Sequence, residues 1–294
     1  MSPGAELEIH VFEDPLAFRD ATEPFLLERE AANNLLLGIL AAMQADVAPV
    51  RLPEGYLALG RDRDGRSVAS VTLWTTGWNV LLSFPDDIRF GAAAGRAMRS
   101  TGADIPGVLG PRLTAHAFAD AWRGADVPIR EGMSQLIYQL DRRPEVPGGG
   151  GRLRVAHPAD RDLLIDWSSG FSRDALHETP TREQVSARVD WRLLGPGGTA
   201  YIWDDDGGTP VSMASATGPT PNGIRIGGVY TPPELRGRGH ASNAVAALSA
   251  RLMDEGRDLC FLFTDASNPT SNAIYRRIGY EQVAEVVELR FGPA

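Results

Sequence analysis

The hydrophobic and polar positions follow the same order of patterns in the two halves of the chain. Residues 56–77 contain two apolar runs on either side of Asp64-Gly65, and residues 200–218 contain two apolar runs around another Asp-Gly pair. Apolar runs that alternate with polar positions and meet at an Asp-Gly pair predict a β-hairpin. Each half is therefore expected to contain one hairpin of this kind.

The segments after each hairpin also match in order. Each half continues with a strand-like run that leads to proline, then a helical pattern, a short apolar run, a second helix and a closing strand. When the halves are aligned on Pro85 and Pro232, Arg89 falls opposite Arg236. Two unrelated α/β domains can share such elements by chance, but the common order and register favour a tandem duplication.

A segment rich in proline and glycine separates the two halves. Residues 144–151 show no periodic apolar pattern, and their composition is typical of a linker. We therefore expect a first domain at residues 1–143 and a second domain at residues 152–294. Because strand and helix patterns are mixed along both halves, the fold class is predicted to be α/β.

Composition limits the class of protein. The chain has 294 residues and a net charge of -9, which argues against general binding to nucleic acid or to an anionic membrane. No apolar run approaches the ~20 residues of a membrane span, and the N-terminus lacks the features of a signal peptide. The single cysteine, Cys260, can form no disulfide within the chain. We expect a cytoplasmic protein without a resident metal.

Positive charge and glycine gather in one segment of this acidic chain, "ELRGRGHAS" at residues 234–242. A strand pattern precedes the segment, and a helical pattern that stops at Gly256 follows it. Gly237 and Gly239 permit a positive φ and let backbone N–H groups approach a ligand closely. Because free N–H groups at a helix N-terminus favour an anion, the segment predicts a phosphate or pyrophosphate site. A tight strand-to-helix turn with solvated arginines is the alternative.

Three designs for binding phosphate through a glycine-rich loop can be compared. A P-loop needs lysine, and all 29 basic residues here are arginine. The dinucleotide design needs G-x-G-x-x-G at a strand end; Gly237, Gly239 and Ser242 come near it, but the segment "TPPELR" intervenes. The third design is the Arg-x-x-Gly-x-Ala loop of acetyl-CoA-dependent acyltransferases, which Arg236, Gly239 and Ala241 match.

A second motif follows the loop at the spacing seen in the same acyltransferases. Asn268 comes after an apolar strand pattern, and Tyr275, Gly279 and Tyr280 lie at the end of the next helical pattern. With both motifs, residues 224–280 resemble the core of the GNAT superfamily of N-acyltransferases. The resemblance implies two tandem GNAT-like domains, each a twisted mixed sheet flanked by helices.

The first domain looks like a degenerate copy of the second. Ala92 and Ala94 stand opposite Gly239 and Ala241, so the first half lacks a glycine of the loop. The resemblance therefore implies that coenzyme A binds to the second domain only and that the first domain is non-catalytic.

The resemblance also implies which residues bind acetyl-CoA. A V-shaped opening between the strands that end at Thr231 and Thr264 would hold the pantetheine arm, the loop would hold the pyrophosphate, and Asn268 would bond a pantetheine amide. The implied residues are Val229, Tyr230, Thr231, Arg236, Gly237, Arg238, Gly239, His240, Ala241, Asn268 and Tyr275. Asn268 is also a candidate N-cap, with Pro269 in the first position of the helix.

Acetyl transfer to an amine requires two proton movements. The resemblance assigns Tyr275 as the proton donor to the departing thiolate, and a core tyrosine is the alternative. Many members of the superfamily carry a base on the strand that here reads "IRIGGVYT", which contains no glutamate. Glu178 is the candidate base and His177 a second candidate, although either can be a solvated or capping group. Proton loss to water needs no base.

Three functions are therefore compared. The first is an N-acetyltransferase that transfers an acetyl group to an amine of a small molecule or peptide by direct attack. The second is a non-catalytic module that binds acyl-CoA with the same fold. The third, and weakest, is a dinucleotide-dependent oxidoreductase. The sequence leaves the acceptor, the acyl-chain preference and the oligomeric state open.

Overall fold

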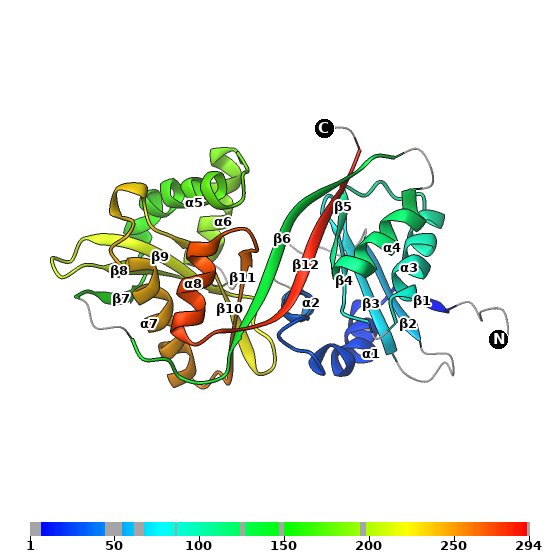
Figure 1. Cartoon of the computed structure of the whole chain (residues 1–294), viewed down its shortest axis with the longest axis horizontal. Coiled ribbons are helices and arrows are strands. Elements are labelled where there is room, and N and C mark those ends of the chain that lie inside the picture. The colour runs from blue at the N-terminus through cyan, green and yellow to red at the C-terminus, as the bar shows by residue number, and fades with distance from the viewer. Residues whose placement is uncertain are drawn as a thin grey trace. The chain divides into compact units, whose positions relative to one another are not determined.

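The protein divides into two compact units (Figure 1). The first unit comprises Met1–Ile137 together with Val283–Ala294, and the second comprises Tyr138–Gln282. The structure, a computed structural model, describes residues 7–44, 55–61, 68–85, 87–123, 127–146, 150–194 and 198–292. Within these residues no helix is both long enough and apolar enough to span a bilayer.

The first unit is a mixed sheet with four helices. Its strands are β1 (Ile9–Phe12), β2 (Gly55–Arg61), β3 (Val68–Thr75), β4 (Val80–Leu82), β5 (Gly107–Gly110), β6 (Ile129–Leu140) and β12 (Glu281–Phe291). Its helices are α1 (Pro15–Leu27), α2 (Asn34–Gln44), α3 (Arg89–Ser100) and α4 (Arg112–Arg123). The strand order is β1-β2-β3-β4-β5-β12-β6, and β4 and β5 run parallel.

The second unit has the same kind of sheet. Its strands are β7 (Arg152–Val155), β8 (Thr199–Asp204), β9 (Pro210–Thr217), β10 (Gly223–Tyr230) and β11 (Leu259–Asp265). Its helices are α5 (Arg161–Ala175), α6 (Arg182–Leu194), α7 (His240–Asp254) and α8 (Pro269–Ile278), with 3-10 turns at Pro158–Asp160 and Pro233–Leu235. The end of β6 joins this sheet beside β11, followed by β10, β9, β8 and β7.

The two units repeat one order of elements, which confirms the predicted duplication. In each unit, a first strand is followed by a pair of helices and then by three antiparallel strands. These strands are β2-β3-β4 in the first unit and β8-β9-β10 in the second. A helix, α3 or α7, then leads to a strand that pairs in parallel with the last of that run. Both predicted hairpins are present as strand pairs, although the turn at Asp64-Gly65 and residues 147–149 of the predicted linker lie outside the described residues.

The closing strands do not lie where the sequence predicted them. The C-terminal strand β12 pairs antiparallel with β5, in a register that runs from Val287 opposite Gly110 to Arg290 opposite Gly107. Val287 and Leu289 are buried in the core of the first unit. The second unit therefore ends at residue 282 and not at 294, and it begins at residue 138 and not at 152. An alternating apolar strand fits either sheet, so its pattern does not identify its partner.

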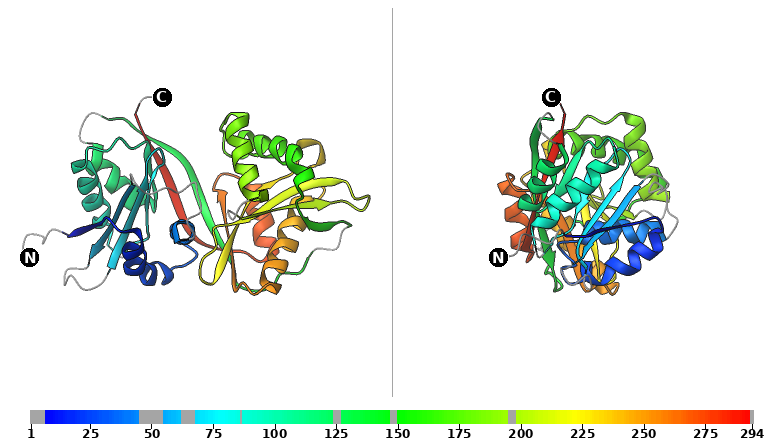
Figure 2. Two further views of the ribbon diagram at one scale, coloured as in Figure 1. Left: turned by 180° about the vertical axis from the view of Figure 1, so that it is seen from behind. Right: turned by 90° about the vertical axis from the view of Figure 1, so that its right-hand side faces the viewer.

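Helices cover both faces of the sheet in the second unit (Figure 2). Ile202 of β8 packs in one core cluster with Val185 of α6 and Tyr230 of β10. The next residue, Trp203, packs in another cluster with Ala244 of α7. Because successive strand side chains point to opposite faces, β8 is apolar at consecutive positions. Helices α5 and α6 therefore lie on one face of the sheet and α7 on the other.

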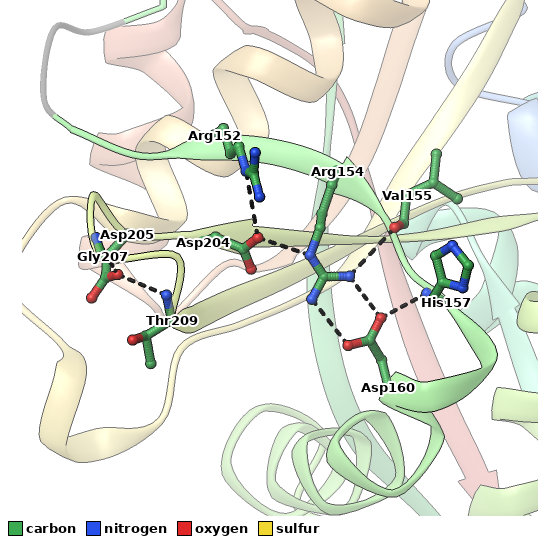
Figure 3. Close-up of polar contacts among 9 residues, drawn as sticks. All are labelled: Arg152, Arg154, Val155, His157, Asp160, Asp204, Asp205, Gly207 and Thr209. Atoms are coloured by element: carbon green, nitrogen blue, oxygen red, sulfur yellow. Dashed lines mark hydrogen bonds and ion pairs between the residues drawn. The ribbon is translucent and has the colours of Figure 1, made fainter.

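An ion-pair network joins the edge strand β7 to the start of α5 (Figure 3). Arg154 donates from Nε to Oδ2 of Asp204 at 2.8 Å and from Nη1 to Oδ2 of Asp160 at 2.7 Å. The hydrogen bond from Arg154 is the largest cause that lowers the pKa of Asp160. Such a pair stabilises the fold above the ordinary carboxyl pKa, and this stability is lost as the pH falls through the lowered value. The network therefore fixes the start of α5 against the edge strand β7.

We predict that Arg154→Met lowers the stability of the protein by about 3–5 kcal/mol, because it leaves the carboxylate of Asp204 buried without its cation. The side chain of Asp204 is 3% exposed, whereas that of Arg152, 3.8 Å from the same carboxylate, is 75% exposed. Arg152→Met is therefore the matched control and should change stability by less than about 1 kcal/mol. Urea unfolding measures both, and equal losses would contradict a structural role specific to Arg154.

Candidate active site

The loop between β10 and α7 has the conformation that its glycines were predicted to permit. Gly237 and Gly239 have φ values of 78° and 82°, in the left-handed region. A Cβ atom at either position would meet nothing within 4 Å, so the glycines are needed for their backbone angles and not for packing. Gly239 is the residue before α7, which places the loop directly at the N-terminus of that helix. We call residues 236–241 the glycine loop.

The backbone amides of this loop are free to bind a ligand. In the described part of the chain, the N–H groups of residues 237–242 donate no hydrogen bond to any backbone or side-chain acceptor. The first hydrogen bond of α7 that reaches back to the loop is from the N–H of Asn243 to the carbonyl of Gly239, at 3.0 Å. Converging free donors at the positive end of a helix dipole form an anion site. This geometry fits a pyrophosphate better than the alternative of a filled turn.

The two arginines of the loop have different roles. Arg236 donates from Nε to the carbonyl of Thr231 at 2.9 Å and from Nη2 to Oδ2 of Asp174 at 2.6 Å. The Asp174 pKa is lowered, chiefly by this hydrogen bond. Arg236 thus ties the loop to the end of α5. Arg238 is exposed and has no carboxylate partner among the described residues, so its charge is the one available to an anion.

Strands β10 and β11 share a short region of parallel pairing. They pair in parallel only at Gly223, Ile224 and Arg225 of β10. The pairing of β10 with β9 is irregular between Gly227 and Tyr230, and Gly228 there has a φ of 61°. This bulge and the loss of pairing leave the last part of β10 without a regular partner on the β11 side.

The other residues predicted on β10 use their backbone and not their side chains toward the opening. The ring of Tyr230 is buried in the core beneath α5, where a Cβ on Gly170 would collide with its hydroxyl. The hydroxyl of Thr231 lies 2.9 Å from that of Ser212. Val229 is partly buried and lies within the irregular region between Gly227 and Tyr230. Strand-like pairing through the backbone is therefore what this segment can offer a ligand.

Helix α8 begins as the sequence predicted. Asn268 is its N-cap and accepts a hydrogen bond from the N–H of Ser271 at 3.0 Å, with Pro269 in the first turn. The cap uses the side-chain oxygen, so the amide NH2 of Asn268 is left to donate to a ligand. No hydrogen bond from that NH2 group is found within the described residues.

Tyr275 lies on the same helix in an aromatic group. Its ring centroid is 6.2 Å from that of Tyr280 and 6.3 Å from that of Tyr138, which comes from the end of β6. Burial raises the pKa of Tyr275 to about 12. Its hydroxyl makes no hydrogen bond among the described residues, whereas the hydroxyl of Tyr280 lies 2.8 Å from that of Ser249. Tyr275 is thus a protonated phenol with a free donor at neutral pH.

The two candidate bases follow the end of α5. His177 and Glu178 have exposed side chains that form no hydrogen bond or ion pair within the described chain. The N–H of Glu178 donates to the carbonyl of Ser172 at 3.0 Å, and His177 has a φ of 55°, which is costly for a residue other than glycine. Within the described residues, neither side chain forms a hydrogen bond or an ion pair with the glycine loop or with β10.

A cavity of about 340 Å³ borders the loop on the side of the β8–β9 turn. Its lining combines Arg238, His240 and Asn243 with Asp205 and Asp206 of that turn. The two carboxylates disfavour phosphate inside the cavity. The free amides of the loop therefore suit an anion better than this cavity does.

In the corresponding segment of the first unit, the amides of Arg89, Phe90 and Gly91 already have acceptors. Helix α3 begins at Arg89, opposite Arg236, whereas α7 begins four residues after Arg236, at His240. The N–H of Arg89 donates to the Asp87 side chain at 2.9 Å, and those of Phe90 and Gly91 donate to the carbonyls of Asp87 and Ile88. A Cβ on Gly91 would collide with the carbonyl of Thr114, so this glycine serves helix packing.

Two residues of the site were missed by the sequence interpretation. Asp174 pairs with Arg236, and no sequence pattern identifies that partner. Arg192 of α6 lies beside the bulge at Gly228. A signal for it was available, because Val185, Val189 and Arg192 follow the i, i+4, i+7 spacing of one helix face.

Comparisons with known proteins agree with the geometry. Residues 162–280 match the family model described as "Acetyltransferase (GNAT) family". A GCN5-related N-acetyltransferase from Sphaerobacter thermophilus is 17% identical, with a TM-score of 0.62 over 99% of this chain and 98% of that one. A Drosophila protein is 13% identical, with a TM-score of 0.67 over 99% of each chain.

A further structure carries the same repeat. It is a tandem GNAT protein from the clavulanic acid biosynthesis pathway, 18% identical, with a TM-score of 0.55 over 98% of this chain and 100% of that one. A comparison with curated proteins found no match. At these identities the solved structures establish the fold, and the family model establishes the family of the matched residues. Residues 162–280 are a domain of the GNAT acetyltransferase family, in a chain that repeats the GNAT fold in tandem.

Proposed function

We propose that the second unit is an N-acetyltransferase that transfers an acetyl group from acetyl-CoA to an amine by direct attack. Membership of the GNAT family supports acyl transfer from an acyl-CoA in general. The observation that carries the specific proposal is the row of free N–H groups at residues 237–242, beside a strand that separates from its parallel neighbour. A diphosphate bound at these amides would thus lie next to a strand whose backbone can pair with an extended chain.

The residues present fit coenzyme A. The amides of residues 237–242 would hold the pyrophosphate, and the exposed guanidinium of Arg238 adds charge beside them. The backbone of Val229 and Thr231 would pair with the pantetheine arm in the manner of an added strand. The free NH2 group of Asn268 would donate to a carbonyl of that arm. Arg236 contributes by holding the loop in place through Asp174.

In the proposed reaction, the ligand supplies the acyl group and the protein supplies the hydrogen-bond donor and the proton donor. Bound acetyl-CoA would supply the acyl group as a thioester. A backbone N–H at the bulge near Val229 would polarise the thioester carbonyl, a kind of donor whose loss typically costs ~10²–10³ in rate. The hydroxyl of Tyr275 would protonate the departing sulfur, since burial keeps this phenol protonated at neutral pH. The carbonyl donor and the proton donor thus come from β10 and α8.

The base is proposed to be Glu178. The proposal depends on its position after α5, whose end is tied to the glycine loop through Asp174 and Arg236. His177 is the second candidate, and water is the third. An exposed carboxylate can accept the proton only if the loop after α5 turns toward the bulge when both substrates are bound.

The two alternative functions are less well supported. A dinucleotide fold needs a parallel sheet with the glycine loop directly at the strand end. Here β10 is antiparallel to β9, and Pro233–Leu235 separates the strand from the loop. A non-catalytic module that binds acyl-CoA would have the same loop but would not need a free phenol at Tyr275. Acetylation of an amine by the wild type distinguishes an enzyme from such a module, and the substitution of Tyr275 then tests the role of the phenol.

Gly239→Val is expected to weaken acetyl-CoA binding at least about tenfold, because a β-branched side chain covers amides that would donate to the pyrophosphate. The residue also strains a left-handed backbone by about 1–2 kcal/mol. Gly256→Val is the matched control, since Gly256 has a φ of 98°, ends the same helix and also has open space around it. Calorimetry should show weak binding for the first variant only. Equal affinity in both variants would remove the loop from the site.

Tyr275→Phe is expected to lower kcat by about 10²–10⁴-fold while acetyl-CoA affinity and melting temperature stay near the wild-type values. The hydroxyl has no partner to lose, so packing should survive. Tyr280→Phe is the control, because it removes the hydroxyl that lies 2.8 Å from Ser249 and should cost about 1 kcal/mol of stability with kcat unchanged.

The same assay tests the base. If Glu178 accepts the proton, Glu178→Gln lowers kcat and His177→Gln does not. Wild-type kcat in Tyr275→Phe would instead favour the non-catalytic alternative for that phenol. The acetylated amine and the released thiol are both measured, so that hydrolysis of the thioester is not mistaken for transfer.

A further inference from the structure

Helix α6 carries an arginine on the face that it buries against the sheet. Val185 and Val189 are buried in the core cluster with Ile202 and Tyr230. Arg192 comes one turn after Val189 on the same face, and its side chain is partly buried. An apolar residue would be expected at this position of an amphipathic helix. The arginine therefore directs a charged group toward the sheet.

The guanidinium of Arg192 reaches the bulge of β10. A Cβ atom on Gly228 would lie 3.6 Å from Nη1 of Arg192 and 3.6 Å from Oγ of Ser215. Ser215 belongs to β9 and is paired with Gly227 of β10. The small residue at 228 thus leaves space over the bulge, and two polar groups border that space.

The charge of Arg192 is not neutralised by the protein. Among the described residues, Arg192 is the partly buried arginine for which no hydrogen bond or ion pair is found. Arg188, one turn earlier, has no carboxylate partner either. The pKa of Arg192 is lowered, first by burial and then by Arg188. Burial also lowers the pKa of Arg225 to about 10, and Arg192 is the second cause.

An unneutralised charge at a partly buried position is destabilising unless a ligand neutralises it. The phosphates of coenzyme A are not the expected ligand, because the free amides that suit them begin at Gly237, beyond Thr231 and the 3-10 turn. The bulge at Gly228 lies earlier in the chain, on β10, where the amine and the acyl carbonyl are proposed to meet. An anion there would belong to the acceptor.

We propose that Arg192, assisted by Arg188, binds an anionic group of the acceptor, so that the preferred substrate is a small amine that also carries a carboxylate or a phosphate. The proposal rests on the assignment of the second unit as an N-acetyltransferase. The planar guanidinium suits both groups, since it donates two parallel hydrogen bonds to a carboxylate or a phosphate. With its anionic group bound to Arg192, the acceptor would hold its amine at a fixed distance from that group and close to the bulge.

The test compares amines that differ only in the anion. β-Alanine is measured against β-alaninamide, and phosphoethanolamine against ethanolamine, by calorimetry with coenzyme A present and by kcat/KM with acetyl-CoA. At least one anionic member should bind about 10- to 100-fold more tightly than its neutral partner, the range for a hydrogen bond to a charged group. The carboxylate and phosphate pairs identify which anion is preferred.

Arg192→Met should remove that preference by weakening the anionic member alone. Arg192→Lys, which keeps the charge but loses the planar fork, should retain part of it. The control is Arg182→Met at the exposed start of the same helix, where Arg182 pairs with Asp166 at 3.0 Å. Arg192→Met should melt no lower than the wild type, because it removes an unneutralised charge. A lower melting temperature with the preference intact would indicate a structural role and overturn the proposal.

Two further outcomes separate this inference from the function on which it rests. Equal binding of anionic and neutral amines by the wild type, with turnover of both, would overturn the inference and leave the acetyltransferase in place. An anion preference that depends on Arg192, with no acetylation of any amine, would support the anion site and contradict the enzyme. An equal fall in kcat for every amine in Arg192→Met would mean that Arg192 polarises the acyl carbonyl and would also overturn the inference.

Discussion

The unpaired backbone amides between β10 and α7 are the constraint on which the rest of the site depends. A helix start leaves N–H groups without acceptors, and two left-handed glycines keep this stretch from closing into a helix or a filled turn. These donors need an anion or water. Arg236 does not fill them, since its guanidinium is held by Thr231 and Asp174. The loop is thus stabilised from outside while its inner surface stays open.

The two units share one order of elements but differ in the amides at the start of the helix, which are unpaired before α7 and paired at the start of α3. In the first unit, α3 begins where the loop would be, and Asp87 and Ile88 accept the amides that are free in the second unit. In the first unit Gly91 allows close helix packing, because a Cβ there would collide with the carbonyl of Thr114. Within the second unit, Tyr138 at the end of β6 lies beside Tyr275 and Arg276. Arg192 adds a feature that the duplication does not require, an unneutralised cation at the bulge.

Local features of the fold and site were predictable, and long-range partners were not. The glycine angles, the cap at Asn268 and the end of α7 near Gly256 follow from backbone preferences of nearby residues. The pairing of β12 with the sheet of the first unit could not be predicted in this way, because an alternating apolar strand is compatible with either sheet. The pairing of Arg236 with Asp174 joins residues far apart in sequence. Arg192 was visible as a charged residue on an apolar helix face, but its neighbours at Gly228 and Ser215 required the structure.

The central claim is that free loop amides create a coenzyme A site in the second unit and that their absence leaves the first unit without one. The number of coenzyme A molecules bound per chain tests it most directly. Titration calorimetry of the full chain should give a single class of site with one molecule bound per chain. Two molecules per chain would show that a helix with satisfied amides can also bind the ligand, and no binding at all would show that free amides in this geometry do not suffice.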